Sequence, residues 1–323
     1  MFSVLAAIYG KIMDVRNRLY DKGVLDLHHL GARVISVGNI TAGGTGKTPL
    51  VAYVANLLAA RGEKVCILTR GYGRDDATKR VLVSDGERLL ADVTEAGDEP
   101  FELAQKLIGK AIVIADADRV AAAEWARRKF GVTAFVLDDG FQHRKVGRDV
   151  DIVCIDATDP FGGGKMLPAG RLREPLNNLG RADVIVITRA DLVDDVSTLR
   201  GQISDLAPQA KVFESANRII NAGEFMGRRA FAFCGLGNPE SFYEQVRREL
   251  IEIVGSRAFV DHHFYTQEDI DVIESEARAA GAEILLTTAK DAVKLSALVF
   301  RLPHQVVEIE IMIDGKQGFV AIV

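Results

Sequence analysis

The stretch NITAGGTGKTPL, residues 39–50, decides the fold because it joins a glycine-rich turn to a lysine and a threonine. The phosphate-loop consensus G-x-x-x-x-G-K-[ST] asks for glycine where this chain has Thr41, whereas Gly46, Lys47 and Thr48 match it. A turn of this kind between a strand and a helix presents backbone N–H groups and the helix dipole to a polyphosphate. We therefore predict a nucleotide site in which Lys47 neutralises phosphates and Thr48 ligates Mg²⁺. Because Thr41 is β-branched, we expect the loop to begin at negative φ.

Short apolar runs rich in valine and isoleucine alternate with helical stretches around this loop. The runs read RVISVGN, KVCILTRG, AIVIAD, TAFVLDDG, VDIVCIDA and ADVIVITRAD. Runs that are apolar on both faces are typical of buried parallel strands, and their spacing leaves room for crossover helices. We predict a P-loop NTPase-like, doubly wound α/β domain over residues 1–212, with a mostly parallel sheet. A second series of strands and helices predicts a smaller α/β domain over residues 213–323.

Composition limits the classes of partner. The chain has 323 residues, of which 48% are hydrophobic, so it can bury a substantial core. Its formal net charge of −5 argues against a nucleic-acid-binding protein, because such domains are usually basic. The three cysteines, Cys66, Cys154 and Cys234, lie far apart in apolar runs, which predicts buried thiols rather than a metal or redox site.

The first 23 residues predict an amphipathic helix. Its apolar positions recur at intervals of three and four residues: Leu5, Ile8, Ile12, Val15 and Leu19. Lys11, Arg16, Arg18 and Lys22 supply positive charge, and the charged residues interrupt any membrane-spanning run. Two interpretations remain open from the sequence, a helix that lies in a membrane interface and a helix docked on its own domain.

A pair of acids, Asp138 and Asp139, ends the apolar run TAFVLDDG. A carboxylate at the end of a strand beside a phosphate loop is a usual ligand of the nucleotide-bound metal. We therefore predict that Thr48, Asp138 and Asp139 form a Mg²⁺ site.

Six strings, taken in order, resemble one family over nearly the whole chain. They are VGNITAGGTGKTP, LTRGYGR, AGDEP, DDGFQHR, MLPAGRLREP and DHHFY, and they are similar to those of the tetraacyldisaccharide 4'-kinase family. Threonine or serine also replaces the first glycine in that family's loop, so Thr41 is expected there. The resemblance implies ATP- and Mg²⁺-dependent transfer of the γ-phosphoryl group to the 4'-hydroxyl of a membrane-embedded, acylated glucosamine disaccharide 1-phosphate. It also implies a peripheral location at the cytoplasmic face of the bacterial inner membrane.

The resemblance assigns roles residue by residue. It gives Asp98 as the base that accepts the hydroxyl proton, and it favours His262 over His263 as the partner of that base. Arg171 is expected to contact the γ-phosphate, and Glu99, Arg119 and His143 to bind the lipid substrate. Lys47 completes the catalytic set. The expected nucleotide-binding residues are Thr41, Ala42, Gly43, Gly44, Thr45, Gly46, Lys47 and Thr48.

One alternative function, that of another class of protein, remains open. The string ITRAD, residues 187–191, resembles the [NT]-K-x-D guanine motif of P-loop GTPases, with Arg189 in place of lysine. A GTP-dependent switch or metallochaperone is therefore the competing hypothesis. The sequence leaves the acyl-chain preference, the oligomeric state and the residues around the nucleotide base undetermined.

Overall fold

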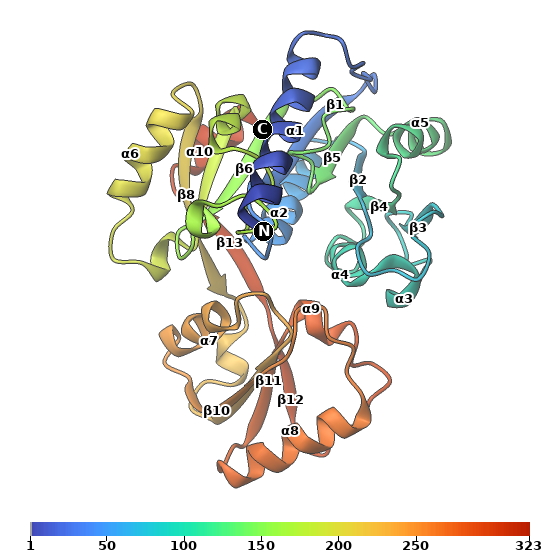
Figure 1. Ribbon diagram of the computed structural model, residues 1–323. Helices are drawn as coiled ribbons and strands as arrows, with labels where there is room; N and C mark the ends of the chain where they lie inside the picture. Colours follow the sequence, from blue (N-terminus) through green and yellow to red (C-terminus); the bar gives the residue numbers. More distant parts are fainter. Residues whose placement is uncertain (1) are drawn as a thin grey trace.

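A nine-stranded sheet forms the core of the large domain in the computed structural model, which describes residues 2–323 (Figure 1). Its strands are β1 (Arg33–Asn39), β2 (Val65–Thr69), β3 (Val81–Ser84), β4 (Ala111–Ala115), β5 (Ala134–Asp138), β6 (Val150–Asp156), β7 (Val184–Thr188), β8 (Lys211–Ile219) and β13 (Ile309–Ile313). Their spatial order is β13-β8-β7-β6-β1-β5-β2-β4-β3, and the two edge strands β3 and β13 pair antiparallel to their neighbours. The other neighbouring pairs are parallel, which confirms the predicted mostly parallel sheet.

Helices cover both faces of this sheet. One face packs against α2 (Lys47–Ala60), α4 (Asp98–Lys106) and α10 (Lys316–Ile322), and the other against α5 (Arg119–Phe130) and α6 (Ser197–Leu206). A short helix α3 (Val93–Ala96) precedes α4. Because the central strands are buried on both sides, their sequences show continuous apolar runs rather than alternation, which explains why the doubly wound fold could be predicted.

A second, four-stranded sheet forms the small domain. Its strands β9 (Arg229–Cys234), β10 (Glu252–Ala258), β11 (Ile284–Thr288) and β12 (His304–Val307) are parallel in the order β10-β9-β11-β12. The helices α7 (Pro239–Arg248) and α8 (Gln267–Ala279) pack on opposite faces, and α9 (Ala289–Ala292) follows β11. This smaller α/β unit agrees with the predicted fold class.

The division between the domains differs from the predicted one. The boundary expected between residues 212 and 213 falls inside β8, which pairs with β7 in the large sheet. Residues 309–323 also return to the large domain as β13 and α10, so the small domain extends from about residue 222 to residue 307. The prediction failed because VVEIEIMID forms two strands, β12 and β13, which join different sheets. Local sequence pattern does not specify the sheet that a strand joins.

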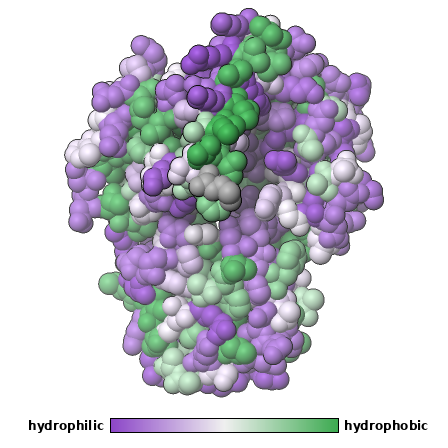
Figure 2. All heavy atoms as spheres, viewed as in Figure 1, coloured by the Kyte–Doolittle hydropathy of each residue, from purple (hydrophilic) through white to green (hydrophobic). Residues whose placement is uncertain are grey.

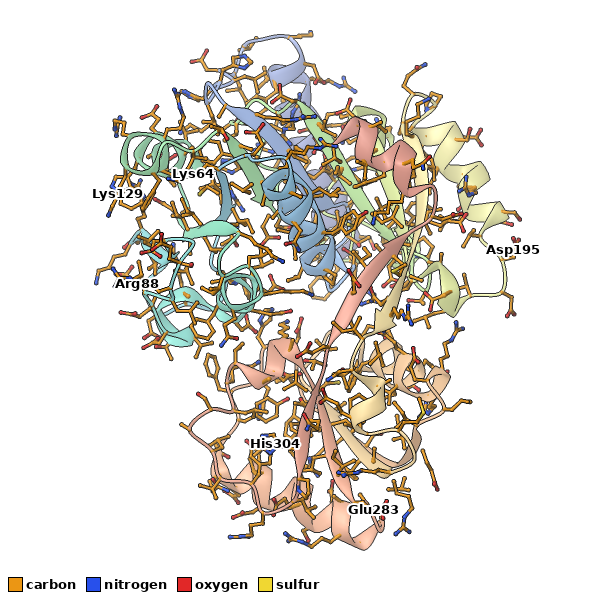
Figure 3. The ribbon with its side chains drawn as sticks, turned by 180° about the vertical axis from the view of Figure 1, so that it is seen from behind. Lys64, Arg88, Lys129, Asp195, Glu283 and His304 are labelled. Carbon is orange, nitrogen blue, oxygen red and sulfur yellow. The ribbon has the colours of Figure 1, made fainter. Side chains whose placement is uncertain are left out.

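The chain crosses between the domains twice, at adjacent positions. The Asn221 side chain donates to the Val306 carbonyl at 2.9 Å and accepts from the Glu308 N–H at 3.0 Å, so it links the two connections. Seen from behind, β13 rises from the small domain into the large sheet (Figure 3). The two chain connections between the domains therefore lie side by side and are linked by hydrogen bonds of Asn221.

Helix α10 gives a test of this domain assignment. Phe319 is fully buried, with its ring centroid 5.4 Å from that of Phe213 and 5.9 Å from that of Tyr53. We expect Phe319→Ala to lower the free energy of unfolding of the large domain by about 3–5 kcal/mol, because a buried aromatic side chain is lost. Urea unfolding measures the effect, with Met312→Ala, at a half-exposed position on β13, as the control. Equal effects of the two substitutions would contradict the packing of α10.

Candidate active site

A cleft of about 990 Å³ lies where the two domains meet, beside the carboxyl ends of the large domain's parallel strands. The large domain contributes residues 43–48 of the phosphate loop and residues at and after the ends of β2 and β5. The small domain contributes residues that follow β9, β10 and β11. Ligands of open α/β sheets bind at the carboxyl ends of the strands, so the cleft lies where a nucleotide is expected.

The phosphate loop folds through two glycines. Gly43 and Gly46 have φ values of 113° and 75°, which side chains with a Cβ rarely adopt. Thr41 has no positive φ, as predicted. Residues 43–48 line the cleft. Thr41 and Ala42 do not line it and lie where the chain enters the loop.

Neighbouring strands fix the body of the loop. Thr45 is buried, and its hydroxyl accepts from the Asn39 side chain at 2.8 Å, while its carbonyl accepts from the Thr188 hydroxyl at 2.9 Å. The Arg189 guanidinium donates to the Gly44 carbonyl at 3.0 Å and pairs with Asp156. Arg189, the residue behind the GTPase alternative, thus supports the loop's backbone.

Two arginines from the LPAGRLREP segment flank the loop, and they differ in position. The Arg171 guanidinium donates to the Ala42 carbonyl at 2.9 Å and pairs with Asp159 at 2.6 Å, but Arg171 is not among the residues that line the cleft. Arg173 lines the cleft and pairs with Asp139 at 2.7 Å. Sequence reasoning favoured Arg171. Residues two positions apart in an extended segment point to the same side, so the local pattern held no signal that would separate the two arginines.

The acid pair follows β5 at the floor of the cleft. Asp138 is buried and accepts from the Thr69 hydroxyl at 3.0 Å; burial, with the charges of Glu99 and Asp139, raises its pKa to about 7. Burial acts in the same direction on Asp139, but the charges of Lys47 and Arg173 outweigh it and lower its pKa to about 2. Lys47 Nζ lies 3.5 Å from Asp139, so the predicted nucleotide lysine and the predicted metal ligands do come together.

A further carboxylate, outside the acid pair, contacts a histidine of the other domain. Asp98, the first residue of α4, is buried, and His262 Nδ1 lies 2.8 Å from its Oδ2 and donates to it. Burial opposes ionisation of Asp98, but the His262 hydrogen bond and the lysines Lys290 and Lys294 lower its pKa below the ordinary value. The same hydrogen bond raises the pKa of His262. His263 lies away from this pair and contacts Asp269 at 3.1 Å.

Lys290 is a cleft residue that the sequence prediction missed. Its ammonium group lies 2.8 Å from Asp261, 3.5 Å from His262 Nε2 and 3.9 Å from Glu99. It follows β11 in the string TTAKD, where a lysine after a buried strand was the available signal. The small domain therefore brings positive charge as well as His262 to the cleft.

Arg119 and His143 form a buried pair on the other side of the acids. Arg119 donates to the Asp138 carbonyl at 2.8 Å and contacts His143 Nδ1 at 3.3 Å. Burial and the nearby arginines lower the pKa of His143 to about 3, so its ring is neutral at physiological pH. Since a guanidinium only donates, Nδ1 accepts and Nε2 carries the proton. Among residues 2–323, that Nε2 atom has no hydrogen-bond partner and is buried.

Helix α1 (Phe2–Asp21) packs on the domain through one face and leaves most of its large apolar side chains in solvent. Its buried positions are Ala6, Gly10, Met13 and Asn17. Leu5, Ile8, Ile12 and Val15, four of the five residues of the predicted apolar face, are 46–59% exposed. Figure 2 shows this hydrophobic line running along α1. The helix therefore docks on its own domain by one face and presents the predicted apolar face outward.

Tyr9 and Met13 of α1 also line the cleft, so the helix adjoins the site. Among residues 2–323, no helix has both the length and the hydropathy to cross a bilayer.

A phosphate loop and an acid pair that line one cleft, with a carboxylate–histidine pair at its wall, define a P-loop phosphotransferase. The family model described as tetraacyldisaccharide-1-P 4'-kinase matches residues 1–323. The chain belongs to this family of tetraacyldisaccharide-1-phosphate 4'-kinases.

Individual relatives agree with this assignment. Tetraacyldisaccharide 4'-kinases of Halothermothrix orenii and Geobacter metallireducens are each 40% identical to the chain, over 92% and 94% of its length and 83% and 90% of theirs. The crystal structure of LpxK from Aquifex aeolicus in complex with ATP superposes with a TM-score of 0.78 at 32% identity, covering 98% of this chain and 96% of that one. The chain is thus an ATP-dependent kinase of lipid A biosynthesis, and the GTPase alternative is not supported.

The phosphate loop can be tested directly. We expect Lys47→Ala to lower turnover about 10²-fold or more with the fold intact, because a preorganised charge on the transferring phosphate is removed. Steady-state kinetics measure the loss, and Lys64→Ala, at an exposed position on the large domain, is the control (Figure 3). Unchanged turnover of Lys47→Ala would exclude this loop as the nucleotide site.

Proposed function

We propose that Asp98 is the general base of the phosphoryl transfer. It accepts the proton of the lipid's 4'-hydroxyl as that oxygen bonds to the γ-phosphorus of ATP. The bond from the γ-phosphorus to the bridging oxygen breaks, and ADP leaves with the electron pair. The observation that carries this proposal is the 2.8 Å contact between the buried Asp98 and His262, because His262 and the phosphate loop line the same cleft.

The phosphate loop and three cationic side chains would hold the nucleotide and the developing charge. Lys47 neutralises the β- and γ-phosphates, and the backbone N–H groups of the loop bind their oxygens. Arg171 and Arg173 are the candidates for the γ-phosphate. In this scheme, Arg173 shares Asp139 with Lys47 before nucleotide binds and is free to move to the phosphate afterwards.

The acid pair fits a divalent cation. Asp138, Asp139 and Thr48 offer hard oxygen donors, which suit Mg²⁺. Burial, and then the charges of Glu99 and Asp139, raise the pKa of Asp138, so a cation beside it would favour its ionised form. When bound with ATP, Mg²⁺ held by these residues would offset the negative charge of the phosphates.

Glu99, Arg119 and His143 are proposed to contact the lipid substrate. Glu99 follows the base directly in α4, so a group near Asp98 is within its reach. His143 has a neutral ring with an unpartnered Nε2–H, a donor suited to a sugar or phosphate oxygen. Arg119 fixes that tautomer through Nδ1 and adds positive charge.

We further propose that α1 docks the enzyme on the cytoplasmic face of the inner membrane, where ATP is available. A substrate with several acyl chains cannot leave the bilayer cheaply, because each buried CH₂ group is worth about 0.8 kcal/mol. The exposed apolar face of α1 adjoins the cleft, and Lys11, Arg18 and Lys22 are exposed near it to meet anionic lipids. Arg16 instead donates to the Gln142 carbonyl at 2.9 Å.

The role of Asp98 can be tested by substitution. We expect Asp98→Asn to lower kcat about 10²- to 10⁴-fold while the KM for ATP changes little, because the lost function is proton transfer. His262→Ala should have a smaller effect, and the double variant should be far from additive, because the two residues act as a unit. Phosphate incorporation into the acylated disaccharide, detected by mass spectrometry, gives the rates.

Asp205→Asn, an exposed position on α6, is the matched control for this series. Near-normal turnover of Asp98→Asn would exclude Asp98 as the base. Simple additivity with His262→Ala would show that the histidine acts independently of it.

The membrane proposal calls for substitution rather than deletion, since Tyr9 and Met13 of α1 line the cleft. We expect Leu5→Ser/Ile8→Ser/Ile12→Ser to reduce binding to vesicles containing anionic lipid about 10²-fold or more, with ATP binding unchanged. Co-sedimentation with the vesicles measures it. The control replaces three equally exposed apolar residues elsewhere, Ile220, Met226 and Val299, with serine. Equal vesicle binding by both triple variants would contradict docking through α1.

A further inference from the structure

Lys294, two residues after the end of α9, lies buried between two carboxylates. Its side chain is 2% exposed, and its Nζ lies 3.4 Å from Asp291 Oδ1 and 3.6 Å from Asp98 Oδ2. The Tyr265 ring covers it, with Nζ 5.7 Å from the ring centroid. Burying a charged lysine costs free energy unless the charge is paired, so the burial of Lys294 depends on both carboxylates.

The two partners of Lys294 belong to different domains. Asp291 is on α9 of the small domain, where its Oδ2 already accepts from the Thr288 hydroxyl at 2.7 Å and from the Gly235 N–H at 3.1 Å. Asp98 is on α4 of the large domain. Asp291 alone would be enough to pair a lysine within the small domain. Lys294 also contacts Asp98, the carboxylate proposed as the base.

The charged groups around Asp98 come from both domains. On α4 they are Glu99 and Glu102, and from the small domain they are Asp261, His262, Lys290, Asp291 and Lys294. Lys290 is shared with Asp261 at 2.8 Å and with Glu99 at 3.9 Å. Lys294 divides its contacts between Asp98 and Asp291, as His262 does between Asp98 and Asp261.

We propose that Lys294 is a positioning residue for Asp98. Lys294 holds the Asp98 carboxylate in its ionised form and in contact with His262. The inference rests on the proposed role of Asp98 as the base. Asp98 receives both of these partners from the small domain, so the base is complete only when the two domains are in contact. Burial alone would favour the protonated acid, and the charge of Lys294 opposes that tendency.

The pH profile of kcat/KM for the acylated disaccharide tests this inference. Asp98 must be ionised to accept a proton, so activity falls on the acid side as it becomes protonated. Removing a positive charge 3.6 Å away raises the pKa of Asp98, so we expect Lys294→Met to move the acid limb up by about one to three pH units. Activity should recover at high pH, because the base itself is still present.

A second variant guards against misfolding. Lys294→Met alone leaves Asp291 buried without its cation, whereas Lys294→Met/Asp291→Asn removes both charges from the small domain. We expect the double variant to keep the upward shift, with circular dichroism and the KM for ATP as checks on folding. Lys64→Met, at an exposed position remote from the cleft, should retain the native profile.

The outcomes separate this inference from the role of the base. A native acid limb in the folded double variant, or an equal loss of activity at every pH, would overturn the inference about Lys294. Activity of Asp98→Asn would instead overturn the assignment of the base, whatever the result at Lys294.

Discussion

The parallel pairing of β1 with β5 is the constraint on which the site depends. Its register sets Val37 opposite Asp138, so the chain enters the phosphate loop at the sheet edge where β5 delivers the acid pair. Parallel strands release their carboxyl ends on one side, and this brings Lys47 to 3.5 Å from Asp139 although the two are far apart in sequence. The nucleotide half of the site therefore follows from strand topology.

The other half of the site depends on the small domain. Asp98 starts a helix of the large domain, while His262 and Lys294 come from the small one. The domains share two adjacent connections, joined by hydrogen bonds of Asn221. Interfaces crossed by so few connections commonly permit relative motion of the domains. Proton acceptance would then be tied to the contact of the domains, and phosphate binding would not.

Helix α1 links the apolar surface to the same site. Its packing face uses small residues such as Gly10, where an added Cβ would lie 3.4 Å from the Met166 side chain. On the same face, Asn17 donates to the fully buried Glu174 at 2.7 Å, and Glu174 also accepts from the cleft residue Gln142 at 2.8 Å. Because α1 packs closely through one face, its large apolar side chains lie on the opposite face. Exposed apolar patches of this kind commonly mark interaction surfaces.

The sequence by itself determined the phosphate loop, the segments that form the buried strands, the acid pair and the family. These features are written in short-range patterns, since glycine conformations, apolar runs and strand ends depend on neighbours along the chain. The tertiary structure decided what depends on distant partners. It assigned β8 and β13 to the large sheet and turned Arg173 rather than Arg171 into the cleft.

The same distinction applies to the proposed base and to helix α1. Asp98 and His262 are 164 positions apart, and no local pattern specifies a contact between them, so only the family resemblance indicated that pair. For Lys290 the local signal was its place after a buried strand, and nothing in the sequence pointed to Lys294, because a lysine in a helical string is usually solvated. Periodicity predicted an apolar face on α1, but only its packing could show which face meets the protein, because that choice depends on the shape of the surface it covers.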